Sequence, residues 1–174
     1  MIKTSTQLKA KVRNLSGSDS FKAQTLIRNF IMERFLERIS LSSYRNNFIL
    51  KGGMLVSAIV GLDMRATMDV DTTVRSMTLS IDSVKEIVEE IITIDAGDGV
   101  EFKITKITNI MEEFDYPGIR IALEASLDRL RQVIRLDVST ADIITPAAIE
   151  FSYKLMYEER SILLYAYNII WKLY

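Results

Sequence analysis

The stretch ATMDVDTT, residues 66 to 73, alternates in the manner of a β-strand, yet it carries two aspartates, which are poor strand formers. In a strand over about residues 67 to 74, Asp69 and Asp71 project from the same face, with their charges close together. The alternate residues, such as Val70, project from the opposite face. The apolar face is therefore expected in the core, and the acidic face is expected to point outwards or into a cleft.

The composition restricts the chemistry that such a strand can serve. The chain has 174 residues, which predicts one domain, or one domain and a fragment, and its 48% apolar and 26% charged residues are typical of a globular protein. The formal net charge of −1 gives no reason to expect a nucleic-acid-binding field over the whole chain. There is no cysteine and no histidine, which excludes disulfides, thiolate and imidazole metal sites and Ser-His-Asp triads. Any metal must be held by oxygen, which favours Mg²⁺, Ca²⁺ or Mn²⁺.

The spacing of the apolar residues predicts an order of elements along the chain. Helices are expected over residues 5–15, 20–39, 54–62 and 82–93, with a final helix after Pro146, and strands over residues 47–50, 67–74, 100–107, 118–127 and 131–140. Ser20 or Asp19 is expected to cap the second helix, and Ser80 and Asp82 the fourth. This order predicts one α+β domain over residues 1–174, with a small mixed β-sheet and helices packed on one side.

A third carboxylate lies in the segment RQVIRLDVST, residues 131 to 140, where Asp137 projects from the polar side of a strand. If the two acidic strands are neighbours in one sheet, Asp69, Asp71 and Asp137 can converge. At an effective dielectric constant of about 20, two charges about 4 Å apart repel by roughly 4 kcal/mol, so that a proton or a divalent cation must offset the repulsion. We interpret the cluster as a cation site, because Mg²⁺ prefers few protein ligands together with phosphate oxygens and water. The alternative is a solvated acidic surface.

The turn formed by Lys51, Gly52 and Gly53 lies between a short apolar strand and a helix. Two glycines allow close approach of the backbone, and a helix N-terminus presents unpaired N–H groups to an anion. The turn is therefore expected to hold a triphosphate, with Lys51 adding a positive charge. Arg65 could contact phosphate or brace a carboxylate, and Thr67 could support the turn. The alternative for each of these residues, taken alone, is a structural role.

Taken together, the run FILKGGMLVSAIVGLDMRATMDVDTTV resembles the first motif of the AbiEii/AbiGii nucleotidyltransferases, which are toxins of bacterial abortive-infection and type IV toxin–antitoxin systems. The family pattern is a strand, KGG, a helix and R-x-T-x-D-[IV]-D. The residues that match it in type and order are Lys51, Gly52, Gly53, Arg65, Thr67, Asp69 and Asp71. The later LDVST, with Asp137, is similar to the third acidic strand of the family, and the resemblance runs from about residue 20 to the C-terminus.

The resemblance implies a polymerase-β-like nucleotidyltransferase fold. It also implies transfer of a nucleoside monophosphate from a nucleoside triphosphate to an acceptor, which in relatives can be tRNA, with Mg²⁺ (or Mn²⁺) as cofactor. Asp69, Asp71 and Asp137 are implied as catalytic residues and metal ligands. The implied nucleotide-binding residues are Lys51, Gly52, Gly53, Arg65 and Thr67.

Family members are usually longer, so residues 1–174 are expected to be a catalytic half without the C-terminal helical domain, and activity depends on whether that domain is essential. The leading hypothesis is a phage-defence toxin with a nucleoside triphosphate, an RNA acceptor and a cognate antitoxin as partners. The alternative is a catalytically incompetent remnant that acts as an interaction module, with homo-oligomers formed through an apolar C-terminal helix. A generic α+β protein with a surface acidic pair is the third interpretation. A cytoplasmic protein without membrane contact is the default, because no targeting segment or bilayer-spanning stretch is evident.

Overall fold

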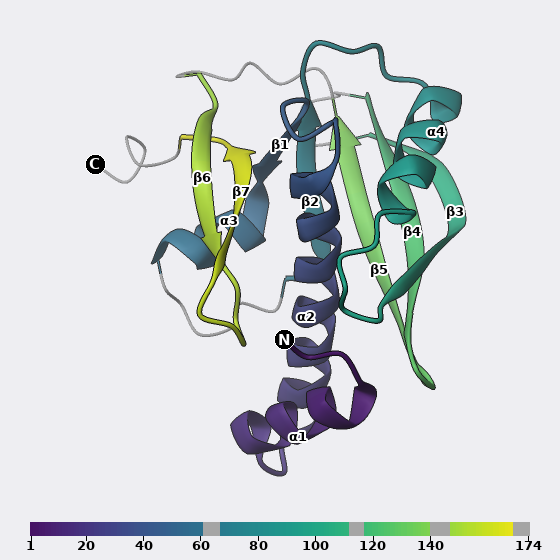
Figure 1. Ribbon diagram of the computed structural model, residues 1–174. Helices are drawn as coiled ribbons and strands as arrows, with labels where there is room; N and C mark the ends of the chain where they lie inside the picture. Colours follow the sequence, from purple (N-terminus) through teal and green to yellow (C-terminus); the bar gives the residue numbers. More distant parts are fainter. Residues whose placement is uncertain (61–66, 112–116, 140–146, 169–174) are drawn as a thin grey trace.

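The computed structural model describes residues 1–60, 67–111, 117–139 and 147–168 (Figure 1). In chain order, the elements are α1 (Ser5–Ser16), α2 (Ser20–Leu41), β1 (Phe48–Lys51), α3 (Gly52–Val60), β2 (Asp69–Val74), α4 (Ile81–Ile92), β3 (Glu101–Met111), β4 (Pro117–Leu127), β5 (Leu130–Ser139), β6 (Ile149–Lys154) and β7 (Ser161–Ala166). The predicted α+β class is confirmed, and the elements up to β5 agree with the sequence prediction to within a few residues.

The sheet has seven strands in the order β3-β4-β5-β2-β1-β7-β6. It is mixed, because β2 pairs in parallel with β5 and β1 in parallel with β7, while the other four pairs are antiparallel. The two acidic strands, β2 and β5, are therefore direct neighbours, as convergence of their carboxylates requires.

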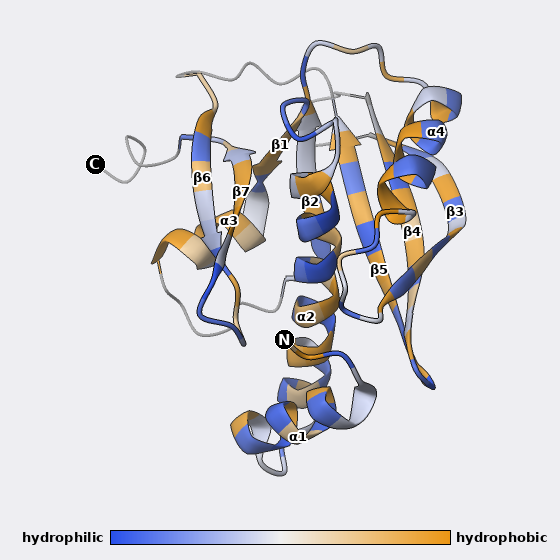
Figure 2. Cartoon of the chain, viewed as in Figure 1, coloured by the Kyte–Doolittle hydropathy of each residue, from blue (hydrophilic) through white to orange (hydrophobic). Residues whose placement is uncertain are grey.

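Helix α2 lies across one face of the sheet, against β5 and β7, and α4 packs beside it against β3 (Figure 1). Figure 2 shows the alternation of hydrophobic and hydrophilic residues along β5 that makes this face apolar. Val70 and Leu136 on the sheet belong to the same buried core as Phe35 on α2. Burial of such side chains contributes about 1.5–3 kcal/mol each, and it fixes which face of each strand points away from the core.

The helix starts follow local hydrogen bonding. The Asp19 carboxylate accepts from the N–H of Lys22 at the start of α2, and the Ser80 hydroxyl accepts from the N–H of Ser83 at the start of α4. Helix α3 begins directly at the end of β1 and contacts both β1 and β2. No helix in the described parts of the chain is both long and apolar enough to cross a membrane.

Helix α2 also buries four charged side chains: Glu33, Arg34, Glu37 and Arg38 are each 2–5% exposed. Arg38 donates to both carboxylate oxygens of Asp98, at 2.9 Å each, and to the carbonyl oxygen of Val100, just before β3. Burial opposes ionisation of Asp98, but the hydrogen bonds from Arg38 outweigh it and lower the pKa of that carboxyl group. This ion pair anchors the loop between α4 and β3 to the core helix.

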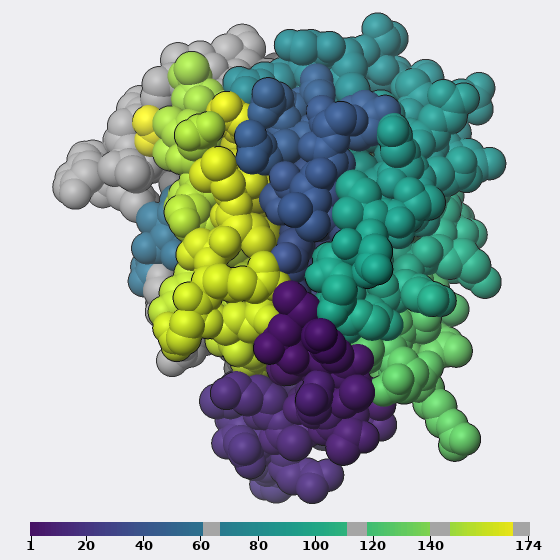
Figure 3. Space-filling model, viewed as in Figure 1, coloured from purple at the N-terminus to yellow at the C-terminus, as the bar shows by residue number. Residues whose placement is uncertain are grey.

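The other buried charges of α2 hold the turn between β6 and β7. Arg160 donates to the two carboxylate oxygens of Glu37, at 2.6 and 3.0 Å, and the N–H of Met156 donates to Glu33 at 3.1 Å. The N-terminal ammonium group lies 3.6 Å from the Glu158 carboxylate, and Figure 3 shows the first residues packed against this turn. The β6–β7 hairpin is thereby fixed to α2 as well as to β1.

The prediction of a final helix after Pro146 is wrong for residues 147–168, the part of this region that the structure describes. These residues form the β6–β7 hairpin instead. The burial of β7 alternates with period two, because Ile162, Leu164 and Ala166 are buried while Leu163 is exposed. The parallel pairing of β7 with β1 satisfies its backbone groups inside the sheet. The apolar C-terminal helix proposed as a homo-oligomer contact is therefore not present in this segment.

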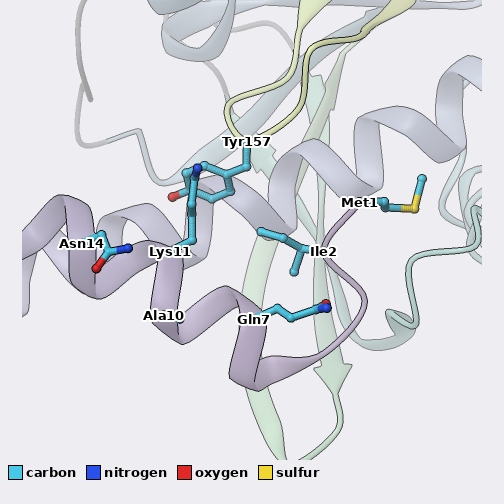
Figure 4. Close-up of a pocket in the computed structure, with 7 residues that line it drawn as sticks. All are labelled: Met1, Ile2, Gln7, Ala10, Lys11, Asn14 and Tyr157. Atoms are coloured by element: carbon cyan, nitrogen blue, oxygen red, sulfur yellow. The ribbon is translucent and has the colours of Figure 1, made fainter.

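A hollow of about 440 Å³ lies between the N-terminal segment, α1 and the hairpin turn (Figure 4). Its lining residues are Met1, Ile2, Gln7, Ala10, Lys11, Asn14 and Tyr157. None of them is one of the residues that the sequence pattern marks for chemistry, and the hollow is separate from the carboxylate site described next.

Candidate active site

The pairing register places four charged residues in one row across the sheet. Lys51 of β1 lies opposite Asp71 of β2, which in turn lies beside Asp137 of β5. Asp137 lies opposite Arg120 of β4. Residues paired in this way project from the same face, so all four side chains lie on the face of the sheet that points away from the core.

The three aspartates named by the sequence pattern come together. One carboxylate oxygen from each of Asp69, Asp71 and Asp137 lies within 4.8 Å of the other two. Asp137 is 6% exposed, and the other two are half-buried. Three carboxylates at this separation and burial repel one another strongly unless positive charge lies close to them.

Two arginines supply that charge. Arg120 donates from Nε to one oxygen of Asp137 and from Nη2 to the other, both at 2.8 Å, and its Nη2 lies 3.8 Å from Asp69. Arg135 donates from Nε to Asp69 at 2.7 Å. The hydrogen bond to Asp137 is the main cause that raises the already high pKa of Arg120, so this guanidinium keeps its charge at every physiological pH.

The glycine turn stands against the acidic strand. Gly52 has φ +75°, and a Cβ added to it would lie 2.9 Å from the Cβ of Asp71 and closer still to its carboxylate. A Cβ added to Gly53 would lie 2.7 Å from the Thr67 hydroxyl oxygen. Both glycines are therefore needed for the N-terminus of α3 to approach Asp71 and Thr67 this closely. That N-terminus carries the unpaired N–H groups and positive partial charge that bind anions.

A chain of hydrogen-bonded hydroxyl groups begins at Lys51, at one end of the row of charges. Lys51 donates from Nζ to the Ser139 hydroxyl at 3.1 Å, and the Thr73 hydroxyl lies 3.1 Å from the same oxygen. Thr73 also lies 3.2 Å from the Tyr167 hydroxyl, at the end of β7. These contacts hold the Lys51 ammonium group on the site face of the sheet, and they link the site to the hairpin strand.

Of the nucleotide-binding residues implied by the sequence, Lys51 and Gly52 lie beside Asp71, and Gly53 lies against Thr67. Arg65 lies outside the described residues. The sequence prediction did not include Arg120. The sequence does indicate that Arg120 lies on a polar strand face, because GIRIALEASL alternates in the same way as the acidic strands. That Arg120 pairs with Asp137 could not be inferred without the order of the strands in the sheet.

The donor set fits a small divalent cation. All three groups offer carboxylate oxygen, which Mg²⁺ and Mn²⁺ prefer. One oxygen from each carboxylate lies within 4.8 Å of the other two, so small side-chain movements would bring the three oxygens to the roughly 2.1 Å from a shared ion that Mg²⁺ requires. Asp69, Asp71 and Asp137 are thus the residues that would hold such an ion.

The class of protein that the fold and site define is a mixed α+β domain with three clustered carboxylates beside the N-terminus of a helix. The chain belongs to the AbiEii family: the profile described as "Nucleotidyl transferase AbiEii toxin, Type IV TA system" matches residues 34–170. The family resemblance inferred from the KGG and D-x-D motifs is confirmed.

Two solved structures are similar to this chain. One is a candidate nucleotidyltransferase from H. pylori (15% identity, TM-score 0.46); the match covers 54% of that protein and 84% of this chain. The other is JHP933 from Helicobacter pylori (17% identity, TM-score 0.46), of which the match covers 52%, with 80% of this chain. The chain thus spans about half the length of each. No curated protein sequence matches it.

Proposed function

We propose that this chain is the catalytic half of a nucleotidyltransferase that uses Mg²⁺ or Mn²⁺ to transfer a nucleoside monophosphate from a nucleoside triphosphate to an acceptor hydroxyl. The observation that carries the proposal is the register that sets Asp71 directly beside Asp137, with Asp69 on the same face and Gly52 against the Asp71 side chain. Membership of the AbiEii family supports the same activity.

The three aspartates would hold the cation. When bound there, the divalent ion would supply positive charge to the triphosphate oxygens and lower the pKa of the acceptor hydroxyl. Gly52 and Gly53 let the N-terminus of α3 lie against Asp71 and Thr67, and the N–H groups of that N-terminus would bind the triphosphate. Lys51 lies on the same face.

In the transfer, the acceptor oxygen forms a bond to the α-phosphorus atom and the bond from that atom to the bridging oxygen of the β-phosphate breaks. Pyrophosphate leaves. We assign the proton of the acceptor hydroxyl to Asp137, which lies on the strand beside Asp71.

Membership of the AbiEii family supports a proposal for the biological role. We propose that the activity is that of a phage-defence toxin, that tRNA or another RNA is the acceptor, and that a cognate antitoxin restrains it in the cytoplasm. The formal net charge of −1 gives no overall positive field, so an RNA acceptor would contact local basic groups on this chain, such as Lys51 and Arg120.

The first test is calorimetric titration of the chain with each nucleoside triphosphate in the presence of Mn²⁺, comparing Asp71→Asn with Asp82→Asn. Asp82 is an exposed acid on α4, remote from the site row, so the control makes the same chemical change elsewhere. We expect Asp71→Asn to weaken nucleotide binding at least tenfold and Asp82→Asn to leave it unchanged. Equal binding by wild type and Asp71→Asn would refute the site.

The second test is incubation with labelled triphosphates and total RNA. Transfer of label that requires Mn²⁺ and is lost in Asp71→Asn supports the enzyme. Intact nucleotide binding with no transfer at any metal concentration would instead assign the chain to the alternative, an interaction module.

A further inference from the structure

Arg120 occupies the carboxylate oxygens of Asp137 that a cation in the site would need. Its guanidinium engages both oxygens of Asp137 at 2.8 Å, and it reaches towards Asp69 at 3.8 Å. Planar, two-point pairing of this kind is the strongest form of carboxylate hydrogen bonding. A divalent cation ligated by Asp137 and Asp69 must therefore compete with Arg120 for the same oxygens.

Three acidic and three basic side chains meet in the site cluster. Asp69, Asp71 and Asp137 are joined in the paired strands by Lys51, Arg120 and Arg135. A divalent cation bound alone would leave this cluster with an excess of positive charge. A cation that arrives with a triphosphate, which carries about four negative charges near neutral pH, would not.

The position of Arg120 suits a second partner. Lys51 and Arg120 stand at opposite ends of the row, with Asp71 and Asp137 between them, so a triphosphate lying over the carboxylates has a basic group on either side. The Arg120 side chain is 34% exposed, whereas that of Asp137 is 9% exposed, so the arginine can turn away from Asp137 towards solvent. The guanidinium fork pairs with phosphate as well as with carboxylate.

We propose that Arg120 is the residue that couples cation binding to nucleotide binding. It competes with a divalent cation for Asp137, and when it is displaced it pairs with the triphosphate that accompanies the cation. This inference rests on the proposed function, and it assigns to Arg120 a role that the KGG and D-x-D sequence motifs do not include.

The coupling has a measurable signature. Wild type is expected to bind Mn²⁺ weakly by itself and at least tenfold more tightly with a non-hydrolysable nucleoside triphosphate. Arg120→Gln removes the competitor and the phosphate partner together, so it is expected to bind Mn²⁺ alone about tenfold more tightly than wild type and to gain much less from nucleotide. Because coupling is reciprocal, Mn²⁺ should likewise improve nucleotide affinity less in this variant.

The experiment is the measurement of free Mn²⁺ by electron paramagnetic resonance, with and without an α,β-methylene nucleoside triphosphate. Arg131→Gln is the matched control: Arg131 lies at the far end of β5, where it donates to the Asp128 and Leu130 carbonyl oxygens. Arg120→Lys keeps the charge but loses the fork, and it protects the buried Asp137 carboxylate if Arg120→Gln fails to fold. Its Mn²⁺ affinity should lie between those of wild type and Arg120→Gln.

The outcomes separate the two proposals. If wild type and Arg131→Gln bind Mn²⁺ with nucleotide but Arg120→Gln and Arg120→Lys bind Mn²⁺ alone no better than wild type, the role of Arg120 is refuted and the nucleotidyltransferase site stands. If no variant binds Mn²⁺ even with nucleotide, the proposed function itself fails. Tighter Mn²⁺ binding by Arg120→Gln together with a reduced nucleotide effect supports both.

Discussion

The substitution Glu33→Gln tests the cost of ionising a buried carboxylate on the core helix α2. Glu33 is 2% exposed, and its carboxylate accepts the N–H of Met156 in the hairpin turn at 3.1 Å. Burial is the largest cause that raises the pKa of Glu33, from 4.5 to about 7. The protein must therefore keep an ionised carboxylate in an unfavourable environment at pH 8, and an amide of the same shape removes that requirement.

The magnitude follows from the two pKa values. Because each pKa unit corresponds to about 1.36 kcal/mol, the difference between 4.5 and about 7 costs the ionised folded state on the order of 3 kcal/mol. Below pH 4.5 the carboxyl group is protonated in both states and the cost is absent. As the pH rises from 4.5 to 7 the unfolded chain binds fewer protons than the folded chain, so stability falls, and above 7 the full cost is present.

Glu33→Gln should therefore raise the free energy of unfolding by about 3 kcal/mol at pH 8 and by less than about 1 kcal/mol at pH 5. Urea unfolding followed by circular dichroism at the two pH values measures this difference. Glu159→Gln is the control, since its side chain is 98% exposed on the same turn and should change stability by no more than about 0.5 kcal/mol at either pH. A gain for Glu33→Gln that is equal at pH 5 and pH 8, or no gain at pH 8, would refute the reasoning.

Two further substitutions test other contacts. Gly52→Ala places a methyl group against Asp71 at φ +75°, so it should abolish metal-dependent nucleotide binding in calorimetry, whereas Gly17→Ala, at φ +57° with nothing within 4 Å, should cost only about 1 kcal/mol of stability and leave binding intact. Arg38→Ala leaves the buried Asp98 carboxylate unpaired and should lower the free energy of unfolding by about 3–5 kcal/mol in urea, and much of that loss should return when Asp98→Asn is added. A double variant as unstable as Arg38→Ala alone would contradict the second expectation.

The predictions that succeeded rest on local properties. The boundaries of α2 were predicted to within two residues at its C-terminal end, since the spacing of its apolar residues and the Asp19 cap are both contained in a short stretch of chain. The polar faces of β2 and β5 were predicted for the same reason. Alternation is a property of one strand, because successive side chains of an extended backbone point in opposite directions.

The C-terminal region shows where local reasoning fails. Short apolar and aromatic runs such as SILLYAY fit a buried helix and a buried strand about equally well by periodicity. The choice is made by backbone hydrogen bonds to β1, a strand more than a hundred residues earlier in the chain, together with the ion pairs of Glu37 and the hydrogen bond to Glu33 that hold the hairpin turn on α2. None of these partners can be recognised within the segment itself.

The sequence by itself determined that Asp69 and Asp71 share a polar strand face, that Asp137 lies on another such face, and that a glycine turn stands before the acidic strand. Only the tertiary structure decided that β2 pairs with β5 so that Asp71 lies directly beside Asp137, and that Arg120 donates to the Asp137 carboxylate. The physical reason is that the direction of a side chain follows from the geometry of its own strand, whereas the neighbour and register of a strand depend on core packing among residues far apart in the chain.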